Sequence, residues 1–193
     1  MSTETENKPL VNTIHNFLDE NVIAHMMQKY ENMKNHAGFR INHYGFWGQG
    51  LARGSYGPVY MMHLDEYSMI MENRVWEVLP QFKGYYPYSL FLHIWQPGSQ
   101  INWHDDVHDK SWEELTTTIY LNKNWNIDWG GLFLYKEKAD SQTGQWVYPA
   151  YNQLNWFTPP VWHATTMCTP AMTEPRLSIQ GFWRKSDTPF IGR

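Results

Sequence analysis

The residues of this sequence best suited to chemistry are two histidines and an aspartate. His104 and Asp106 are two positions apart, so an extended strand would project both side chains from the same face. His163 lies much further along the chain, in another segment with the composition of a strand. Two polar residues at such spacing are common by chance, and a lone histidine is usually a core residue. The order in which the three follow one another, and the residues around them, predict that they bind one metal ion.

The rest of the composition narrows the kind of metal site. Cys168 is the single cysteine, which excludes an internal disulfide and a zinc cluster built on cysteines. Metal chemistry would then depend on histidine and carboxylate ligands. Two histidines and one carboxylate on one face of an ion form the facial triad typical of non-haem Fe(II) sites, with positions left open for O2 chemistry. His104, Asp106 and His163 are therefore predicted to be both the metal ligands and the catalytic centre.

Short β-rich segments separated by turn residues follow one another in the second half of the chain. This pattern predicts a mainly β domain with the architecture of a jelly roll. The predicted strands are residues 88–95, 100–104, 115–121, 131–135, 145–148, 154–157, 162–166 and 177–183.

Two amphipathic helices are expected before these strands. Apolar residues recur every three or four positions over residues 10–33, with a break near 19–21, and again from about 65 to 82. Residues 38–60 between them are rich in glycine and aromatic side chains, which suits either two strands or a mobile lid. We expect one domain over residues 1–193, with helical support over about 10–82 and a jelly-roll core over about 88–183.

The bulk composition limits the partners. Fifteen Lys and Arg residues against 19 Asp and Glu give a formal net charge of -4, and no basic run occurs, so nucleic acid is not expected as a partner. No stretch reaches the roughly 18 apolar residues of a membrane span, and the N-terminus lacks the apolar segment of a signal peptide. A cytoplasmic protein without a membrane partner is expected, and its oligomeric state is left open.

At this point the chain resembles a known family, the 2-oxoglutarate- and Fe(II)-dependent oxygenases, and within it the branch that is similar to prolyl 4-hydroxylases. The resemblance covers roughly residues 88–183. It rests on His104-Asp105-Asp106, Tyr120-Leu121-Asn122, Gly130-Gly131-Leu132, Pro149 with residues 152–157, His163, and Arg176-Leu177-Ser178.

The resemblance implies a double-stranded β-helix and three reaction partners, namely Fe(II), 2-oxoglutarate as co-substrate, and O2. Arg176 would bind the far carboxylate of 2-oxoglutarate through two parallel hydrogen bonds, a geometry that lysine cannot reproduce. Ser178, on the same strand face, would add a hydroxyl. Prolyl hydroxylases often have tyrosine where Trp95 stands here, so Tyr120 could supply the missing phenol. Asn122 and Asn152 could orient the ligands indirectly.

The resemblance also implies a reaction: hydroxylation of an unactivated C–H bond with release of succinate and CO2. The retained Asp106 argues against halogenation, whereas desaturation and ring formation stay open. The substrate would be a prolyl residue, a free amino acid or another small metabolite. Trp47, Arg53 and His108 are the candidate substrate contacts.

Two other classes of protein fit parts of the pattern. A cupin-type metal oxygenase or isomerase would share the jelly roll and the histidines without using oxoglutarate, and Arg176 with Ser178 argues against it. A non-catalytic jelly-roll binding protein would use its aromatic residues for stacking, and the retention of all three metal ligands argues against that. Iron-dependent release of succinate from 2-oxoglutarate is expected only for the oxygenase, so this measurement would distinguish the three hypotheses.

Overall fold

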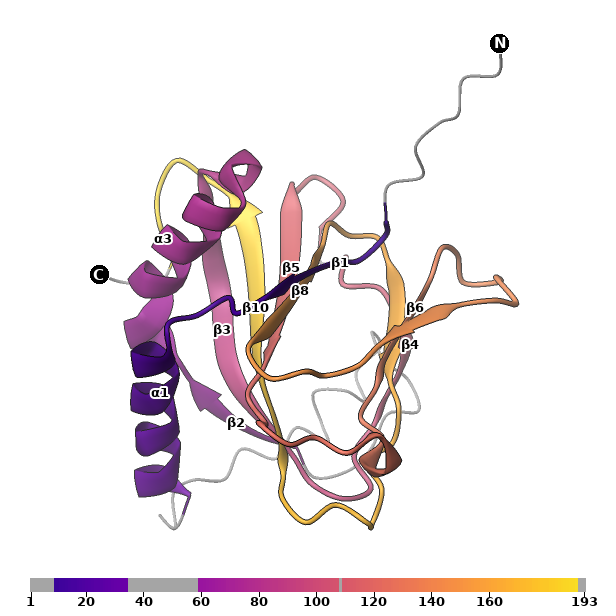
Figure 1. Cartoon of the computed structure of the whole chain (residues 1–193). Helices are drawn as coiled ribbons and strands as arrows, with labels where there is room; N and C mark the ends of the chain where they lie inside the picture. Colours follow the sequence, from indigo (N-terminus) through magenta and orange to yellow (C-terminus); the bar gives the residue numbers. More distant parts are fainter. Residues whose placement is uncertain (1–8, 35–58, 108, 191–193) are drawn as a thin grey trace.

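Two antiparallel sheets face each other in the computed structural model, which describes residues 9–34, 59–107 and 109–190 (Figure 1). The larger sheet has six strands in the order β1 (Asn12–His15), β8 (Gln153–Phe157), β5 (Glu114–Tyr120), β10 (Arg176–Lys185), β3 (Tyr85–Trp95) and β2 (Val59–His63). The smaller has four, in the order β4 (Ile101–His104), β9 (Trp162–Thr165), β6 (Phe133–Lys136) and β7 (Gln145–Val147). This is the jelly-roll, double-stranded β-helix arrangement.

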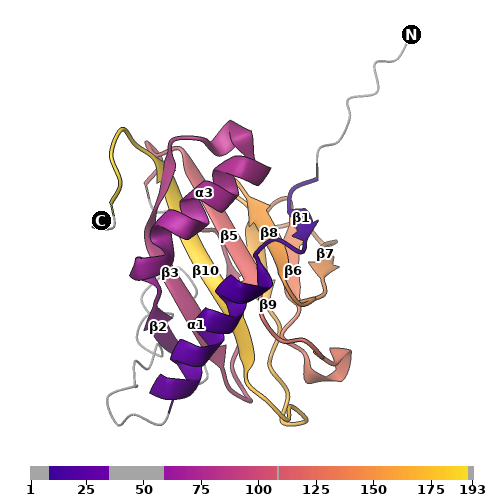
Figure 2. The same ribbon diagram turned by 60° about the vertical axis from the view of Figure 1, so that its left-hand side comes forward.

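The helices cover the outer face of the six-stranded sheet, as Figure 2 shows. They are α1 (Glu20–Met33) and α3 (Ser68–Val78), accompanied by the short 3-10 turns η1 (Asp65–Tyr67) and η2 (Pro80–Phe82); a third turn, η3 (Ile127–Trp129), precedes β6. Apolar side chains of both helices and of β3, β5 and β10 form one buried cluster. No helix in the described part of the chain is both long and apolar enough to span a bilayer.

Strand β10 shows how the larger sheet divides its two faces. Leu177 and Ile179 belong to the apolar cluster under the helices, whereas Arg176 donates a hydrogen bond to Ser178 on the opposite face. Successive side chains of a strand point to opposite faces, so the second set points into the space between the two sheets. The outer face of this sheet is thus an apolar core, and its inner face carries polar groups.

Most of the expected elements are present. All the strands predicted from residue 88 onward occur within a few residues of their predicted limits, and α3 with its flanking turns occupies the second predicted helix. The helix predicted over residues 10–33 is wrong for its first half. Asn12–His15 is instead a strand, β1, that pairs with the edge of β8. Polar residues such as Asn12 and Thr13 are weak helix formers, and pairing with a sheet edge outweighs the spacing of the apolar positions.

Candidate metal centre

The pairing of β4 with β9 brings two histidines side by side. His104 and His163 are partners in the antiparallel register, and their ring centroids are 4.2 Å apart. Asp106 follows the end of β4 and meets both rings. Its Oδ1 is 3.5 Å from Nε2 of His104, and its Oδ2 is 3.4 Å from Nε2 of His163. Residues far apart in the sequence therefore present three donor atoms to one point.

Each histidine is oriented by a backbone carbonyl of its own strand segment. Nδ1 of His104 lies 2.7 Å from the carbonyl oxygen of Asn102, and Nδ1 of His163 lies 2.8 Å from that of Val161. A carbonyl can only accept, so Nδ1 of each ring carries the proton and donates. Nε2, the nitrogen that faces Asp106, is then available as a metal ligand in the neutral ring.

The donor set suits a divalent metal. The three ligand atoms lie within 4.8 Å of one another, and all three residues are buried. Donors bound at about 2.1 Å to a common ion lie roughly 3–3.5 Å apart, close to the separations between Asp106 and the rings. Two neutral imidazoles and one carboxylate would leave Fe(II) with one net positive charge and open positions.

Burial and the carboxylate affect the two histidines differently. Burial lowers the pKa of His163 to about 4, although the charge of Asp106 acts in the other direction. For His104 burial also lowers the pKa, but the hydrogen bond and charge of Asp106 outweigh it and raise the pKa above its ordinary value. In the metal-free protein, His163 is therefore neutral at neutral pH, whereas Nε2 of His104 takes up its proton at a higher pH than Nε2 of His163 does.

A buried arginine lies further along the inner face of the larger sheet. Arg176 is only 2% exposed, and its guanidinium lies over the rings of Trp95 and Tyr120, 5.1 and 5.0 Å from their centroids. One of its nitrogens donates to Ser178, while its buried Nε has no hydrogen-bond partner among the described residues. A buried guanidinium with a donor to spare fits an anion such as a carboxylate.

The groups around Arg176 hold one another in place. Asn155 donates to the hydroxyl of Tyr120 at 3.0 Å, and Nε1 of Trp95 donates to the hydroxyl of Ser178 at 3.2 Å. Burial raises the pKa of Tyr120 against the opposing charge of Arg176, so the phenol stays neutral. One end of the barrel is therefore lined by five interacting side chains, those of Trp95, Tyr120, Asn155, Arg176 and Ser178.

Two asparagines singled out in the sequence have different tasks. Asn122 accepts from the backbone N–H of Leu177 at 2.7 Å and donates to the carbonyl of Pro175 at 2.9 Å, so it fixes the backbone on both sides of Arg176. Asn152 instead exchanges two hydrogen bonds of 2.8 Å with the backbone of Leu18. Asn122 thus orients Arg176 indirectly, whereas Asn152 anchors the N-terminal segment to the sheet.

Gly131 is a contributor to the site whose role the sequence did not reveal. A Cβ at this position would lie 2.6 Å from Cδ of Arg176, and the residue has a φ of +64°. Glycine adopts this conformation without strain and leaves the room that the arginine occupies. The Gly130-Gly131 pair was recognised as part of the family resemblance, but only the fold shows which side chain passes over it.

The predicted substrate contacts Trp47, Arg53 and His108 lie outside the described residues. The same holds for the proposed lid over residues 38–60, except for its last two positions, where β2 begins.

The chain is similar to one protein family and to several solved structures. Residues 90–184 match the family model of the 2OG-Fe(II) oxygenase superfamily. No curated protein sequence matches the chain.

Solved structures with the same fold include two prolyl hydroxylases. A prolyl-4-hydroxylase from Pseudomonas putida is 17% identical, with a TM-score of 0.61, over 92% of this chain and 93% of that one. A prolyl hydroxylase from Trichoplax adhaerens, in complex with a peptide fragment of the hypoxia inducible factor oxygen degradation domain, is also 17% identical, with a TM-score of 0.69, over 93% and 84% of the two chains. A 2OG-Fe(II) oxygenase family oxidoreductase from Burkholderia pseudomallei is 12% identical, with a TM-score of 0.65, over 93% and 86%.

Proposed function

Because the chain belongs to the 2OG-Fe(II) oxygenase superfamily, and so is a 2-oxoglutarate-dependent dioxygenase, we propose that His104, Asp106 and His163 hold its iron. The observation that carries this proposal is the register of β4 and β9, which brings three buried ligand atoms within 4.8 Å of one another. Fe(II) with bound 2-oxoglutarate and O2 supplies the oxidising chemistry, in which the co-substrate yields succinate and CO2 while one oxygen atom enters a C–H bond.

The protein contributes charge, orientation and exclusion of water. Asp106 supplies the single negative charge among the ligands, and the carbonyls of Asn102 and Val161 keep Nε2 of the two histidines directed toward it. The rings of Phe133 and Phe157 pack on His163, with centroids 5.3 and 4.9 Å away. This apolar wall limits access of water to one side of the centre.

The co-substrate would be held at its far end by Arg176. Its guanidinium is buried, lies between Trp95 and Tyr120, and retains a donor without a partner among the described residues. Ser178 would add its hydroxyl. The ring of Tyr120 lies against the guanidinium, and its phenol would contact the same far carboxylate of 2-oxoglutarate. A fixed far carboxylate leaves the opposite end of 2-oxoglutarate to face the metal, which orients the co-substrate before reaction.

We further propose that residues 1–193 form one domain, since α1, α3 and three strands of the larger sheet share one apolar cluster. The substrate is a small molecule or a peptide, and within that range we favour a prolyl residue or a free amino acid. The prolyl hydroxylase from Trichoplax adhaerens was solved with a peptide, which supports a site of suitable size in this fold.

The test is turnover of purified full-length protein with Fe(II), ascorbate and 2-oxoglutarate. We expect succinate and CO2 to form only when iron is present, and to rise when the correct member of a panel of amino acids and prolyl peptides is added. With 18O2, one labelled atom should enter succinate and one the product. Product without succinate would favour a cupin-type reaction, and the absence of both across the panel would contradict the proposal.

A further inference from the structure

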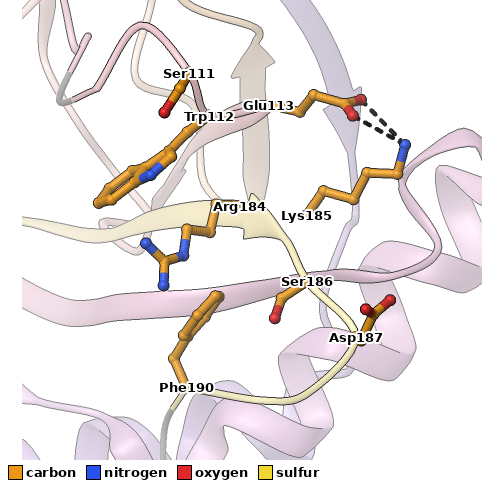
Figure 3. A pocket seen from close by; sticks show the side chains of 8 residues that line it. All are labelled: Ser111, Trp112, Glu113, Arg184, Lys185, Ser186, Asp187 and Phe190. Carbon is orange, nitrogen blue, oxygen red and sulfur yellow. Dashed lines mark hydrogen bonds and ion pairs between the residues drawn. The ribbon is translucent and has the colours of Figure 1, made fainter.

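A second polar site lies at the opposite end of β10 from Arg176. It is an open pocket of about 460 Å³ between the end of β10 and the segment that precedes β5. Figure 3 shows the side chain of Arg184 crossing this pocket between the rings of Trp112 and Phe190. The hydroxyl groups of Ser111 and Ser186 also line it.

The two rings hold the Arg184 guanidinium in place. Its central carbon lies 4.2 Å from the centroid of Trp112 and 3.9 Å from that of Phe190. Stacking of this kind uses the faces of the guanidinium and leaves its N–H edges available. The guanidinium of Arg184 forms no hydrogen bond or ion pair with the side chain of any described residue, and its ring contacts are those with Trp112 and Phe190. Stacking thus orients the guanidinium, and its N–H groups are available to donate hydrogen bonds to a planar anion such as a carboxylate.

The neighbouring lysine behaves differently and provides a contrast. Nζ of Lys185 lies 3.1 and 3.2 Å from the two carboxylate oxygens of Glu113, on the side away from the rings in Figure 3. This pair neutralises itself, and the carboxylate of Asp187 also lines the pocket. Arg184 is thus the one unpaired cation among the described residues that line it, which suits a ligand with one negative charge better than one with two.

The register of the larger sheet places this pocket beside the metal centre. The ring of Phe157 contacts His163, and Phe157 pairs with Thr116, which in turn pairs with Phe182. The centre is therefore level with Phe182, and Arg184 lies two residues, or about 7 Å, further along the strand. Arg176 lies six residues away in the other direction, where the co-substrate would bind.

Tyr88 interacts both with the pocket around Arg184 and with the metal centre. Its ring lies 5.8 Å from that of Trp112, and its hydroxyl donates to Glu114 at 2.9 Å. Burial, the contact with Glu114 and the charge of Asp106 all raise the pKa of Tyr88. Tyr88 therefore contacts the pocket wall at Trp112 and also interacts with the charge of the metal-ligating carboxylate.

We propose that this pocket binds the carboxylate of a small carboxylic acid substrate, and that Arg184 is the residue that recognises it. The inference rests on the proposed function, because it assigns the substrate class of the same centre. With 2-oxoglutarate anchored at Arg176 and the substrate anchored at Arg184, the two molecules approach the metal from opposite ends of β10.

The test uses full-length protein with Mn(II) in place of iron and saturating 2-oxoglutarate, so that the Arg176 site is filled. The probe is 4-fluorobenzoate, followed by 19F NMR, with neutral 4-fluorobenzamide as its matched partner. Mn(II) should broaden the benzoate signal, and the amide should bind at least about tenfold more weakly. Arg184→Gln should weaken benzoate binding about 10- to 100-fold, as expected for loss of a charge-assisted contact. The control Lys185→Gln should change it less than about twofold.

Equal binding of acid and amide, unchanged binding in Arg184→Gln, or no binding of either probe would each overturn the inference. Binding of Mn(II) and 2-oxoglutarate is followed separately through water proton relaxation. If those two fail to bind, the proposed function is contradicted. The benzoate titration is then repeated on metal-free wild-type and Arg184→Gln protein and followed through the 19F chemical shift, where the wild type should still bind benzoate more tightly than the variant if the pocket is a carboxylate site.

Discussion

Along β10, Leu177 and Ile179 join the apolar cluster under the helices, whereas Arg176 and Ser178 face the space between the sheets. The helix-covered face is held by burial, which depends on volume and apolar area. The inner face is held by specific pairs, such as Asn155 with Tyr120. A change on the outer face should therefore alter stability alone, and a change on the inner face or at the metal ligands should alter binding.

The largest effect is expected at the metal ligands. His104→Ala, Asp106→Ala and His163→Ala should each abolish turnover, because each removes one of three donors. Loss of a residue that only supports a ligand already costs about 10- to 100-fold in metal affinity, so loss of a ligand should cost more. Titration with Mn(II) or Co(II) measures this. The matched control is Trp103→Phe, next to His104, which should bind metal normally. A ligand variant with wild-type affinity would remove that residue from the triad.

Arg176→Gln should come next. It removes a charge-assisted contact and leaves a carboxylate poorly paired in a buried site, which costs on the order of 2–5 kcal/mol, or roughly 30-fold or more in affinity for 2-oxoglutarate. Metal affinity should stay the same, since the arginine does not contact the ligands. Ile179→Val, on the other face of the same strand, is the control and should leave the 2-oxoglutarate titration unchanged. An unchanged titration in Arg176→Gln would assign the role to another cation.

Gly131→Ala should produce a smaller loss of the same kind. The added methyl group would lie 2.6 Å from Cδ of Arg176, so the arginine must shift, and we expect the KM for 2-oxoglutarate to rise roughly 3- to 10-fold. Gly84→Ala separates this contact from backbone strain, because Gly84 also has a positive φ, of +89°, with nothing within 4 Å of the added Cβ. Both variants should lose stability, and only Gly131→Ala should change KM. Equal KM values would mean that Arg176 tolerates the displacement.

The pH dependence of metal binding sharpens the contrast between the two histidines. The pKa of His163 is lowered to about 4, so at neutral pH its Nε2 carries no proton that a metal ion would have to displace. The pKa of His104 is raised, so below it a metal ion must displace a proton. Apparent metal affinity should then rise by about tenfold per pH unit up to the pKa of His104 and level off above it. Co(II) titrations across the neutral range measure this, and a flat profile would contradict the assignment of the proton to His104.

The sequence predicts those features of the fold and the site that depend on one segment of the chain, and it fails for features that depend on pairing between distant segments. The alternation of β10 is a property of a single strand, and the spacing of His104 and Asp106 is visible in the sequence although Asp106 lies beyond the end of β4, so pattern alone predicted both. The N-terminal strand β1 was missed because it exists only through its pairing with β8. The roles of Gly131 and Arg184 depend on which distant side chain crosses a glycine, and on which residues lie level with the metal. These follow from the registers between strands, which a single sequence does not specify.

The smallest effect on binding is expected from the helix-covered face. Leu92, in β3, is fully buried in the apolar cluster, whereas its neighbours Phe91 and His93 stack on each other. Leu92→Ala should cost about 2–5 kcal/mol of stability through lost burial and the cavity left behind, which lowers Tm by about 5–15 °C. Metal affinity and the KM for 2-oxoglutarate, measured well below the new Tm, should stay within about twofold of wild type, because no inner-face hydrogen bond involves this side chain. Calorimetry gives the Tm, a metal titration gives the metal affinity, and a steady-state assay gives the KM for 2-oxoglutarate, all on the same preparation. A rise in KM that follows the loss in Tm would show that the cluster under the helices sets the position of Arg176, and the two faces of the sheet would then have to be treated as one coupled unit.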